Sequence, residues 1–277
     1  MSGLTPAMCS LHTHTTFCDG KNTLEEMAAA AYEAGVRYYG VSCHSHTAIP
    51  HDEGAVLPAD MTAYRQAVLA LREQYAGRME VLLGLEWDSQ SDVAPEGLDY
   101  WIGSVHNLCD RARGVYHAID WSEQRLTACR DEMFGGDALA MTEEYFREAA
   151  EVAAKRPTIL GHLDLITKLN AGNRFFDEDA SRYRAAALEA LHAADPAATL
   201  LEVNTGGISR GHRTMPYPAL FLLREWRAMG GRIILTADAH RTEHIVSCYR
   251  EAAEAAKAAG FTQSTLLTLR GPVECSL

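Results

Sequence analysis

Apolar runs typical of β-strands alternate with alanine-rich stretches typical of helices along nearly the whole chain. This alternation predicts a parallel sheet with helices outside it, and seven such units favour closure into an α/β barrel. The 277 residues contain no Gly- and Pro-rich linker and no second composition zone, so we expect one domain, residues 1–277. The expected strands cover residues 10–15, 38–42, 80–86, 100–106, 158–162, 199–204 and 232–236.

Residues typical of helix ends predict where the first helix begins and ends. Thr23 and Glu26 have the spacing of a capping box, and Gly35 has the position of a helix end. Further helices are expected over residues 61–75, 142–155, 180–193, 217–229 and 242–259. The least regular stretch, residues 107–136, is expected to be a long loop over one end of the barrel, where it would shape a pocket.

The composition excludes several classes of protein. A formal net charge of -12 disfavours binding nucleic acid stably through a broad basic surface. The first ten residues lack the pattern of a signal peptide, and no apolar run is long enough to span a membrane, so we expect a cytoplasmic protein. The seven cysteines are scattered without a C-x-x-C pair, which indicates reduced thiols rather than a disulfide framework.

Imidazole and carboxylate side chains gather at or just after the expected strand ends. A lone histidine in a strand is more often a core or surface residue than a ligand. The joint pattern is different, because the strand ends of a parallel barrel share one face and these groups bind Zn, Mn or Fe. The candidates for a metal site are His12, His14, Asp19, His44, Glu86, His106, His162, Asp238 and His240.

Two short patterns sharpen this prediction. His12 and His14 project to the same side of a strand and can grip one ion together. Asp238 and His240 repeat this spacing after the last expected strand, which becomes a neighbour of the first strand on closure of the barrel. The two patterns together indicate a metal site more strongly than either alone.

These residues also carry a resemblance to a known family. The segments HTHT at 12–15, SCHS at 42–45, GLE at 84–86, SVH at 104–106, GHLD at 161–164 and ADAH at 237–240 resemble, in order, the motifs of the PHP (polymerase and histidinol phosphatase) family. The resemblance implies a distorted (β/α)7 barrel with three divalent metal ions, Zn, Mn or Fe, at the C-terminal ends of the strands.

The resemblance also implies how the ligands divide. One ion would be held by His12, His14, Glu86 and Asp238, a second by Glu86, His106 and His162, and a third by Asp19, His44 and His240. One position departs from the family, which often has an acid where this chain has Cys43. Two interpretations stay open: a weaker or altered third site, or a small buried filler.

Within the family, residues 12–22, 45–47 and 204–207 most resemble the histidinol-phosphate phosphatase branch. This implies a phosphomonoesterase of histidine biosynthesis. It would hydrolyse L-histidinol phosphate, a small phosphorylated metabolite, to L-histidinol and phosphate by in-line attack of a metal-bridging hydroxide. The oligomeric state stays open.

Cationic side chains in an acidic protein are candidates for binding the phosphate. Arg210 and Arg213 lie in a glycine-containing loop after a strand end, and Arg174, Lys168 and Arg241 are weaker candidates. His46 and Asp164 follow two ligands by two residues and are candidates for protonating the leaving group. Trp87 and Asp88 are candidates for contacting the rest of the substrate.

Three other functions stay open. The first is a PHP phosphoesterase acting on a nucleotide, an oligonucleotide end or another phosphorylated metabolite. The second is amidohydrolase-like hydrolysis of a C–N bond, although nothing marks the ligand lysine typical of that class. The third is a metal-binding module without activity. A serine or cysteine hydrolase is disfavoured, because no G-x-S-x-G motif occurs and no cysteine has the context of a nucleophile.

Overall fold

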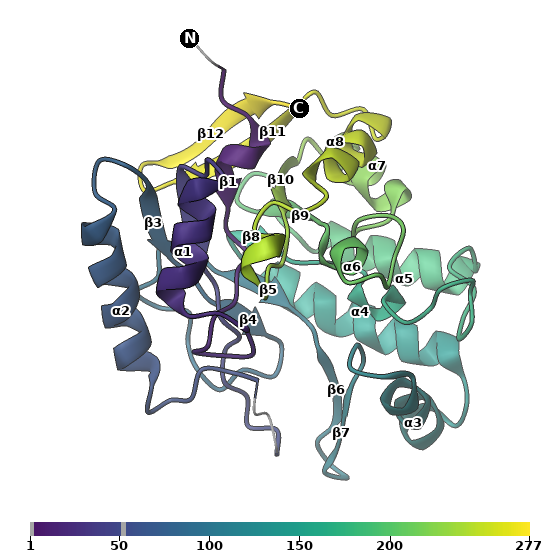
Figure 1. Cartoon of the computed structure of the whole chain (residues 1–277). Helices are drawn as coiled ribbons and strands as arrows, with labels where there is room; N and C mark the ends of the chain where they lie inside the picture. Colours follow the sequence, from purple (N-terminus) through teal and green to yellow (C-terminus); the bar gives the residue numbers. More distant parts are fainter. Residues whose placement is uncertain (1–2, 51–53) are drawn as a thin grey trace.

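Two parallel β-sheets form the centre of the fold, and the longer helices pack around them (Figure 1). The structure is a computed structural model that describes residues 3–50 and 54–277. One sheet has the order β1-β2-β3, with β1 (Cys9–Ser10), β2 (Tyr38–Val41) and β3 (Glu80–Leu83). The other has the order β10-β9-β8-β5-β4, with β4 (Glu86–Asp88), β5 (Ile102–Ser104), β8 (Ile159–Leu160), β9 (Leu200–Asn204) and β10 (Arg232–Thr236).

The two sheets meet at both of their edges without forming one continuous ladder. Beyond β1 and β10, Thr13 and Ala239 form an isolated parallel bridge, in which the Ala239 amide donates to the His12 carbonyl at 2.9 Å. At the other edge, His44 forms a parallel bridge with Glu86. The α/β fold with parallel strands is therefore confirmed, whereas hydrogen bonding does not run unbroken around a closed seven-stranded barrel.

The strand expected over residues 80–86 is interrupted at Gly84, which separates β3 from β4. Tyr64 stabilises the backbone at this break between the strands, because its hydroxyl donates to the carbonyls of Val41 at 3.0 Å and Gly84 at 2.8 Å. The ring of Tyr100 occupies the space where a side chain at position 84 would lie. Glycine at this position thus lets the chain pass Tyr100 just before it reaches Glu86.

The helices largely match the expectations. The capping box of α1 is present, since the Thr23 side chain accepts from the Glu26 amide and the Glu26 side chain accepts from the Thr23 amide. The predicted helix over residues 242–259 is divided into η3 (Thr242–His244) and α8 (Tyr249–Ala258). The remaining helices are η1 (Pro6–Met8), α1 (Leu24–Glu33), α2 (Met61–Gln74), α4 (Ala138–Ala154), η2 (Leu165–Thr167), α5 (Ser181–His192), α6 (Gly206–Ser209) and α7 (Leu220–Ala228).

The expectation that residues 107–136 form a long loop was wrong. This segment contains an antiparallel hairpin, β6 (Asn107–Asp110) with β7 (Val115–Ala118), followed by α3 (Glu123–Phe134). The helix begins where the Ser122 side chain accepts from the Arg125 amide, and it ends at Gly135 in a left-handed conformation. Leu108 and Leu126 are fully buried and anchor the segment to the core.

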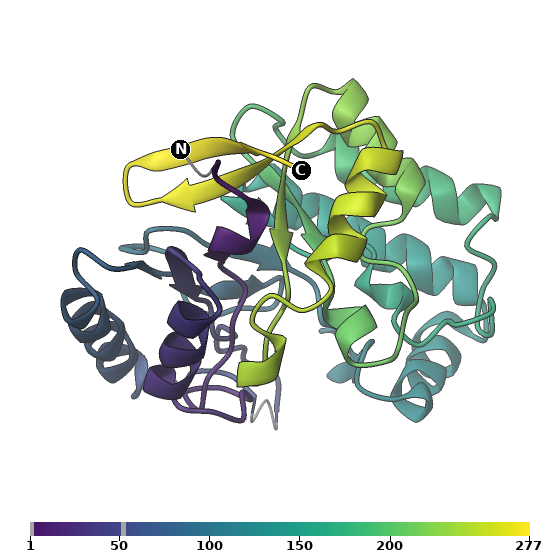
Figure 2. The same cartoon turned by 45° about the horizontal axis from the view of Figure 1, so that its top comes forward.

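A second antiparallel hairpin, unexpected from the sequence, is formed by β11 (Gln263–Thr268) and β12 (Gly271–Ser276). It lies at the end of the molecule opposite the β6–β7 hairpin (Figure 1), and Figure 2 shows it in yellow beside the N-terminal segment. Its Leu266 and Leu267 pack in a cluster with Leu11, Tyr100 and Ile234 that covers the N-terminal ends of the strands. Among the helices of the described residues, none combines the length and the apolar character needed to cross a membrane.

Candidate metal centre

Glu86, at the start of β4, lies at the middle of a cluster of imidazoles. Its side chain is fully buried, and its two oxygens face five histidines. Oε2 lies 3.1 Å from His12 Nε2, 3.4 Å from His14 Nε2 and 3.0 Å from His44 Nδ1. Oε1 lies 3.2 Å from His106 Nε2 and 2.8 Å from His162 Nε2. A carboxylate placed between two sets of imidazoles can bridge two metal ions.

Asp238 completes the set around Oε2 of Glu86. Its Oδ1 lies 3.4 Å from His14 Nε2 and 3.7 Å from His12 Nε2. Asp238, two residues after the end of β10, has a φ of 51°, which is unusual for a residue other than glycine. Such strained backbone is typical of functional sites, because the surrounding structure holds it in place for the side chain.

Asp19 forms the third part of the cluster. Its Oδ1 lies 3.7 Å from both His14 Nδ1 and His44 Nε2, and its Oδ2 lies 3.2 Å from His240 Nε2. The nine predicted ligands therefore converge from both sheets. Four groups each have their ligand atoms within 4.8 Å of one another: His14, Asp19, His44 and His240; His12, His162 and Asp238; His12, His14 and Glu86; and His44, Glu86 and His106.

The chemistry of this cluster fits divalent metal ions. His12 Nε2, His14 Nε2, Asp19 Oδ1 and Glu86 Oε2 are buried and have no hydrogen-bond partner among the described residues. Leaving a buried polar atom without a partner costs roughly 1–3 kcal/mol, so several at one point indicate a ligand that satisfies them together. Imidazole nitrogens and carboxylate oxygens suit Zn, Mn or Fe.

The electrostatics lead to the same conclusion. Burial opposes ionisation of Glu86, but His12, His44 and His106 outweigh it and hold the pKa of the carboxyl well below its usual range. Burial likewise opposes protonation of His44, yet Glu86 and Asp19 raise the pKa of this imidazole to about 10. The carboxylates thus create a region of negative potential that stabilises positive charge, as a site for cations requires.

Comparison with known proteins gives the family. The profile of the PHP domain matches residues 10–206 of this chain. The chain belongs to the PHP domain family. The chain is 24% identical over 268 residues to the histidinol-phosphatase of Bacillus subtilis, with 86% of this chain and 95% of that protein covered. It is 29% identical over 251 residues to a protein of Deinococcus radiodurans named "probable histidinol-phosphatase", with 84% and 86% covered.

A solved structure shares the fold of this PHP domain. It is the histidinol phosphate phosphatase of Lactococcus lactis subsp. lactis, complexed with Zn, L-histidinol and phosphate. The TM-score is 0.70 at 19% identity, and the likeness covers 95% of this chain and 98% of the other. At this identity the likeness shows the fold.

Two acids behind the candidate ligands orient the imidazoles. Glu202, fully buried in β9, accepts from His12 Nδ1 at 2.6 Å and from the His162 amide at 2.6 Å. Asp88 accepts from the His106 amide at 2.9 Å and from His106 Nδ1 at 3.0 Å. Each acid directs the other ring nitrogen of its histidine toward Glu86, which sets the tautomer that a metal ligand needs.

Sequence reasoning missed Glu202 and gave Asp88 a different role. An acid in the apolar run LLEVN was the available signal for Glu202, since a charge is almost never fully buried without a partner. Asp88 was expected to contact the substrate, but its side chain turns to His106. Trp87 is buried, and its indole donates to the Val93 carbonyl at 2.8 Å.

The predicted phosphate-binding cations lie in different surroundings. Arg210 contacts the centre, because its Nη2 lies 2.8 Å from Asp238 Oδ2 and its Nη1 lies 3.3 Å from His240 Nδ1. Arg213 pairs with Glu178 at 2.9 Å, and Lys168 pairs with Asp120 at 2.8 Å. The side chain of Arg174 is 61% exposed and pairs with Glu123. Their roles in binding substrate stay predictions.

The two candidates for the leaving-group acid, His46 and Asp164, also differ. His46 Nδ1 lies 2.8 Å from Asp92 Oδ1, and its Nε2 has no hydrogen-bond partner among residues 3–50 and 54–277. Asp164 is buried, accepts from the Ala219 amide at 2.8 Å, and has its pKa raised to about 6 by burial. Both catalytic roles stay predictions. Cys43 is fully buried, with its sulfur 3.4 Å from Thr15 Oγ1.

Proposed function

We propose that this PHP domain is a metal-dependent phosphomonoesterase that hydrolyses L-histidinol phosphate to L-histidinol and phosphate. The observation that carries the proposal is Glu86, buried between imidazoles from both sheets with unsatisfied ligand atoms around it. Two relatives named as histidinol-phosphatases and a shared fold with a phosphatase that binds Zn, L-histidinol and phosphate support the substrate.

The proposal assigns three ions to the cluster. His12, His14, Glu86 and Asp238 would hold the first, Glu86, His106 and His162 the second, and Asp19, His44 and His240 the third. Bound divalent ions supply a nucleophile at neutral pH, by lowering the pKa of water, and neutralise charge on phosphoryl oxygens. The contacts across both sheet edges support the finer description of the fold as a distorted (β/α)7 barrel.

The chain's own residues would perform the remaining tasks. Glu202 and Asp88 fix the orientation of His12 and His106, so the ligands need little rearrangement when substrate binds. Arg210 has the best position among the predicted cations for a phosphate oxygen, because it already lies against Asp238 and His240. Arg213, Lys168 and Arg174 would contribute only by exchanging their present acidic partners for substrate.

His46 is the better placed of the two proposed acids. Asp92 accepts at Nδ1 and can stabilise a proton on the ring, so that Nε2 could donate it to the leaving alkoxide. Asp164 would serve the same role only if its unpaired Oδ1 reached the substrate, since its Oδ2 is occupied by the Ala219 amide. The variants His46→Gln and Asp164→Asn separate the two proposals. Removing the residue that protonates the leaving group should lower kcat/KM strongly on L-histidinol phosphate but much less on activated aryl phosphates, whose leaving groups need no proton.

A panel of substrates tests the function itself. Purified, metal-loaded protein is assayed for phosphate release from L-histidinol phosphate, nucleoside monophosphates and oligonucleotides with a terminal phosphate. We expect the highest kcat/KM on L-histidinol phosphate. Faster turnover of a nucleotide would replace the proposed substrate, and full metal content without hydrolysis of any ester would reject the enzyme.

The variants His14→Ala and Glu86→Gln test the centre. Each removes a ligand at the middle of the cluster, so we expect kcat/KM to fall by about a thousandfold or more. Circular dichroism should show a retained fold, and metal analysis should show ion loss. Normal turnover in either variant would mean that the cluster is not the active site.

A further inference from the structure

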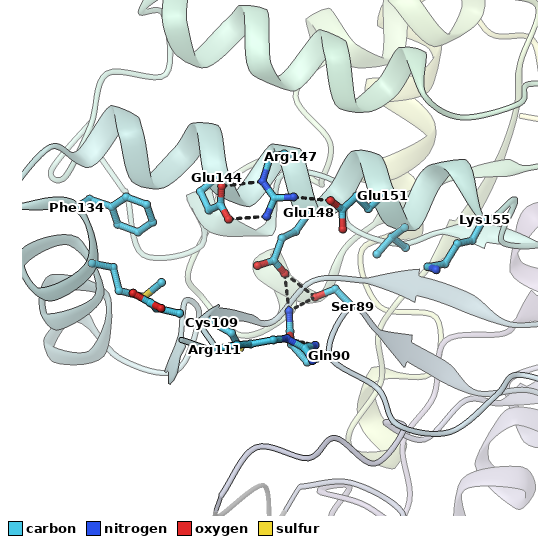
Figure 3. Close-up of a pocket in the computed structure, with 13 residues that line it drawn as sticks. Ser89, Gln90, Cys109, Arg111, Phe134, Glu144, Arg147, Glu148, Glu151 and Lys155 are labelled. Atoms are coloured by element: carbon cyan, nitrogen blue, oxygen red, sulfur yellow. Dashed lines mark hydrogen bonds and ion pairs between the residues drawn. The ribbon is translucent and has the colours of Figure 1, made fainter. Parts of the chain in front are cut away.

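A pocket of about 480 Å³ lies apart from the candidate metal ligands (Figure 3). Its walls are α4, the end of α3, the end of β6 and the residues that follow β4. None of the residues lining it is among the nine candidate metal ligands. A volume of this size is typical of sites for small molecules.

Several charged side chains in this pocket form ion pairs with one another. Arg147 pairs with Glu144 at 2.6 Å and also with Glu151, all three on α4. Asp110 at the hairpin lies 3.7 Å from Arg113. Each of these groups therefore already has a neighbour of opposite charge.

Glu148 is different. It is 5% exposed and reaches from α4 toward Ser89 and Gln90 (Figure 3). Its Oε2 accepts from Ser89 Oγ at 2.9 Å and from Gln90 Nε2 at 2.7 Å, and both donors are neutral. No cation pairs with it among residues 3–50 and 54–277, and burial raises its pKa to about 7. A buried acid without a cation is unfavourable, so a positively charged ligand would stabilise it.

Two cations at the mouth of the pocket lack an acidic partner within the described part of the chain. Arg111 donates to Gln90 Oε1 at 2.8 Å, and Lys155 lies 5.6 Å from the ring of Trp87. Both side chains are exposed, whereas Glu148 is at the floor. The pocket thus has an unpaired negative group inside and unpaired positive groups at its rim. Met133 and Phe134 add an apolar wall.

We propose that this pocket binds a free α-amino acid. The ammonium group would pair with Glu148, the carboxylate would face Arg111 and Lys155 at the mouth, and the side chain would lie against Met133 and Phe134. A zwitterion matches this arrangement because it supplies both charges in one small molecule. The proposal does not depend on the substrate of the metal centre.

The test begins with a thermal-shift screen of the standard amino acids, each at millimolar concentration, on the metal-loaded protein. We expect at least one to raise the melting temperature of the wild type. The variant Glu148→Gln keeps the size and an acceptor but removes the charge, and should bind that amino acid at least tenfold more weakly by calorimetry. Glu33→Gln, on the exposed side of α1, is the matched control and should bind normally.

Two analogues of that amino acid then test the two charges. The corresponding amine lacks the carboxylate, and the corresponding deaminated acid lacks the ammonium group. We expect both to bind the wild type at least tenfold more weakly, and Arg111→Gln with Lys155→Met to weaken the amino acid but not the amine. Absence of any shift, binding unchanged in Glu148→Gln, or equal binding of either analogue would overturn the proposal.

Discussion

Glu202 contacts two candidate metal ligands without being one of them. It accepts from His12 Nδ1 and from the His162 amide, and thereby orients two candidate ligands at once. We predict that Glu202→Gln weakens metal binding by about 10–100-fold, because the orientation and basicity of His12 are lost. Competition with a coloured chelator measures this affinity. Glu189→Gln, an acid-to-amide change at an exposed position of α5, should leave it unaltered, and equal affinities in both variants would contradict the role of Glu202.

The histidines also give the metal-free protein a defined pH dependence. The pKa of His44 is raised from an ordinary 6.5 to about 10 because Glu86 and Asp19 face the ring. Its contribution to stability is therefore complete below pH 6.5 and is lost as the pH rises toward 10. We predict that the melting temperature of chelator-treated protein falls across this range. Metal-loaded protein should fall less, because metal binding requires neutral imidazoles; parallel curves would disprove the coupling.

The candidate ligands could be predicted from the sequence because strand ends of a parallel sheet share one edge, which brings His14 and His240 together. The orienting acids could not be predicted in the same way. Whether Glu202 reaches His12 depends on which strands are neighbours and on the orientation of the His12 imidazole. The residue pattern along one strand gives neither the order of the strands nor this orientation.

At the level of strands, the passage from β3 to β4 depends on Gly84. A side chain there would overlap the ring of Tyr100, and neither can move far in a filled core. We predict that Gly84→Ala lowers the free energy of unfolding by roughly 1–3 kcal/mol, as overpacking does. It should also displace Glu86, so metal content should fall. Gly54→Ala, which has room for a methyl group, is the control for denaturant unfolding. Equal stability of the two variants would show that the ring of Tyr100 can move aside for the methyl group.

In the segment 107–136 the sequence pattern predicted neither the β6–β7 hairpin nor helix α3. In α3 only Leu126 and Cys129 are buried, and in the β6–β7 hairpin only Leu108 and His117 are. So few apolar positions produce no clear period, although Ser122 and Gly135 are ordinary start and stop signals for a helix. By contrast, α1 carried both a capping box and four buried positions on one side, and its prediction was confirmed.

Over the whole molecule, residues beyond the family match belong to the cluster of candidate ligands. The match ends at 206, whereas Asp238 and His240 contribute from beyond β10, and the β11–β12 hairpin covers the strands at the other end. These contacts support our proposal that residues 1–277 form one domain.

A substitution at Leu266, which is fully buried in β11, tests whether the chain unfolds as one domain. We predict that Leu266→Ala destabilises the entire chain by about 2–5 kcal/mol, as cavities in a core do. Loss of circular dichroism and release of metal should occur in one shared transition at a lower temperature. Val273→Ala, at a position that is 39% exposed in β12, should change little. Two separate transitions would instead indicate two independent units.

The division of the ligands between the two sheets has a thermodynamic consequence. His12, His14 and His44 follow strands of one sheet, whereas Glu86, His106, His162 and Asp238 belong to the other. An ion shared by them links folding to mass action: each tenfold rise in free metal above the dissociation constant adds about 1.4 kcal/mol of apparent stability. The melting temperature of this protein therefore depends on the concentration of free metal as well as on the protein itself.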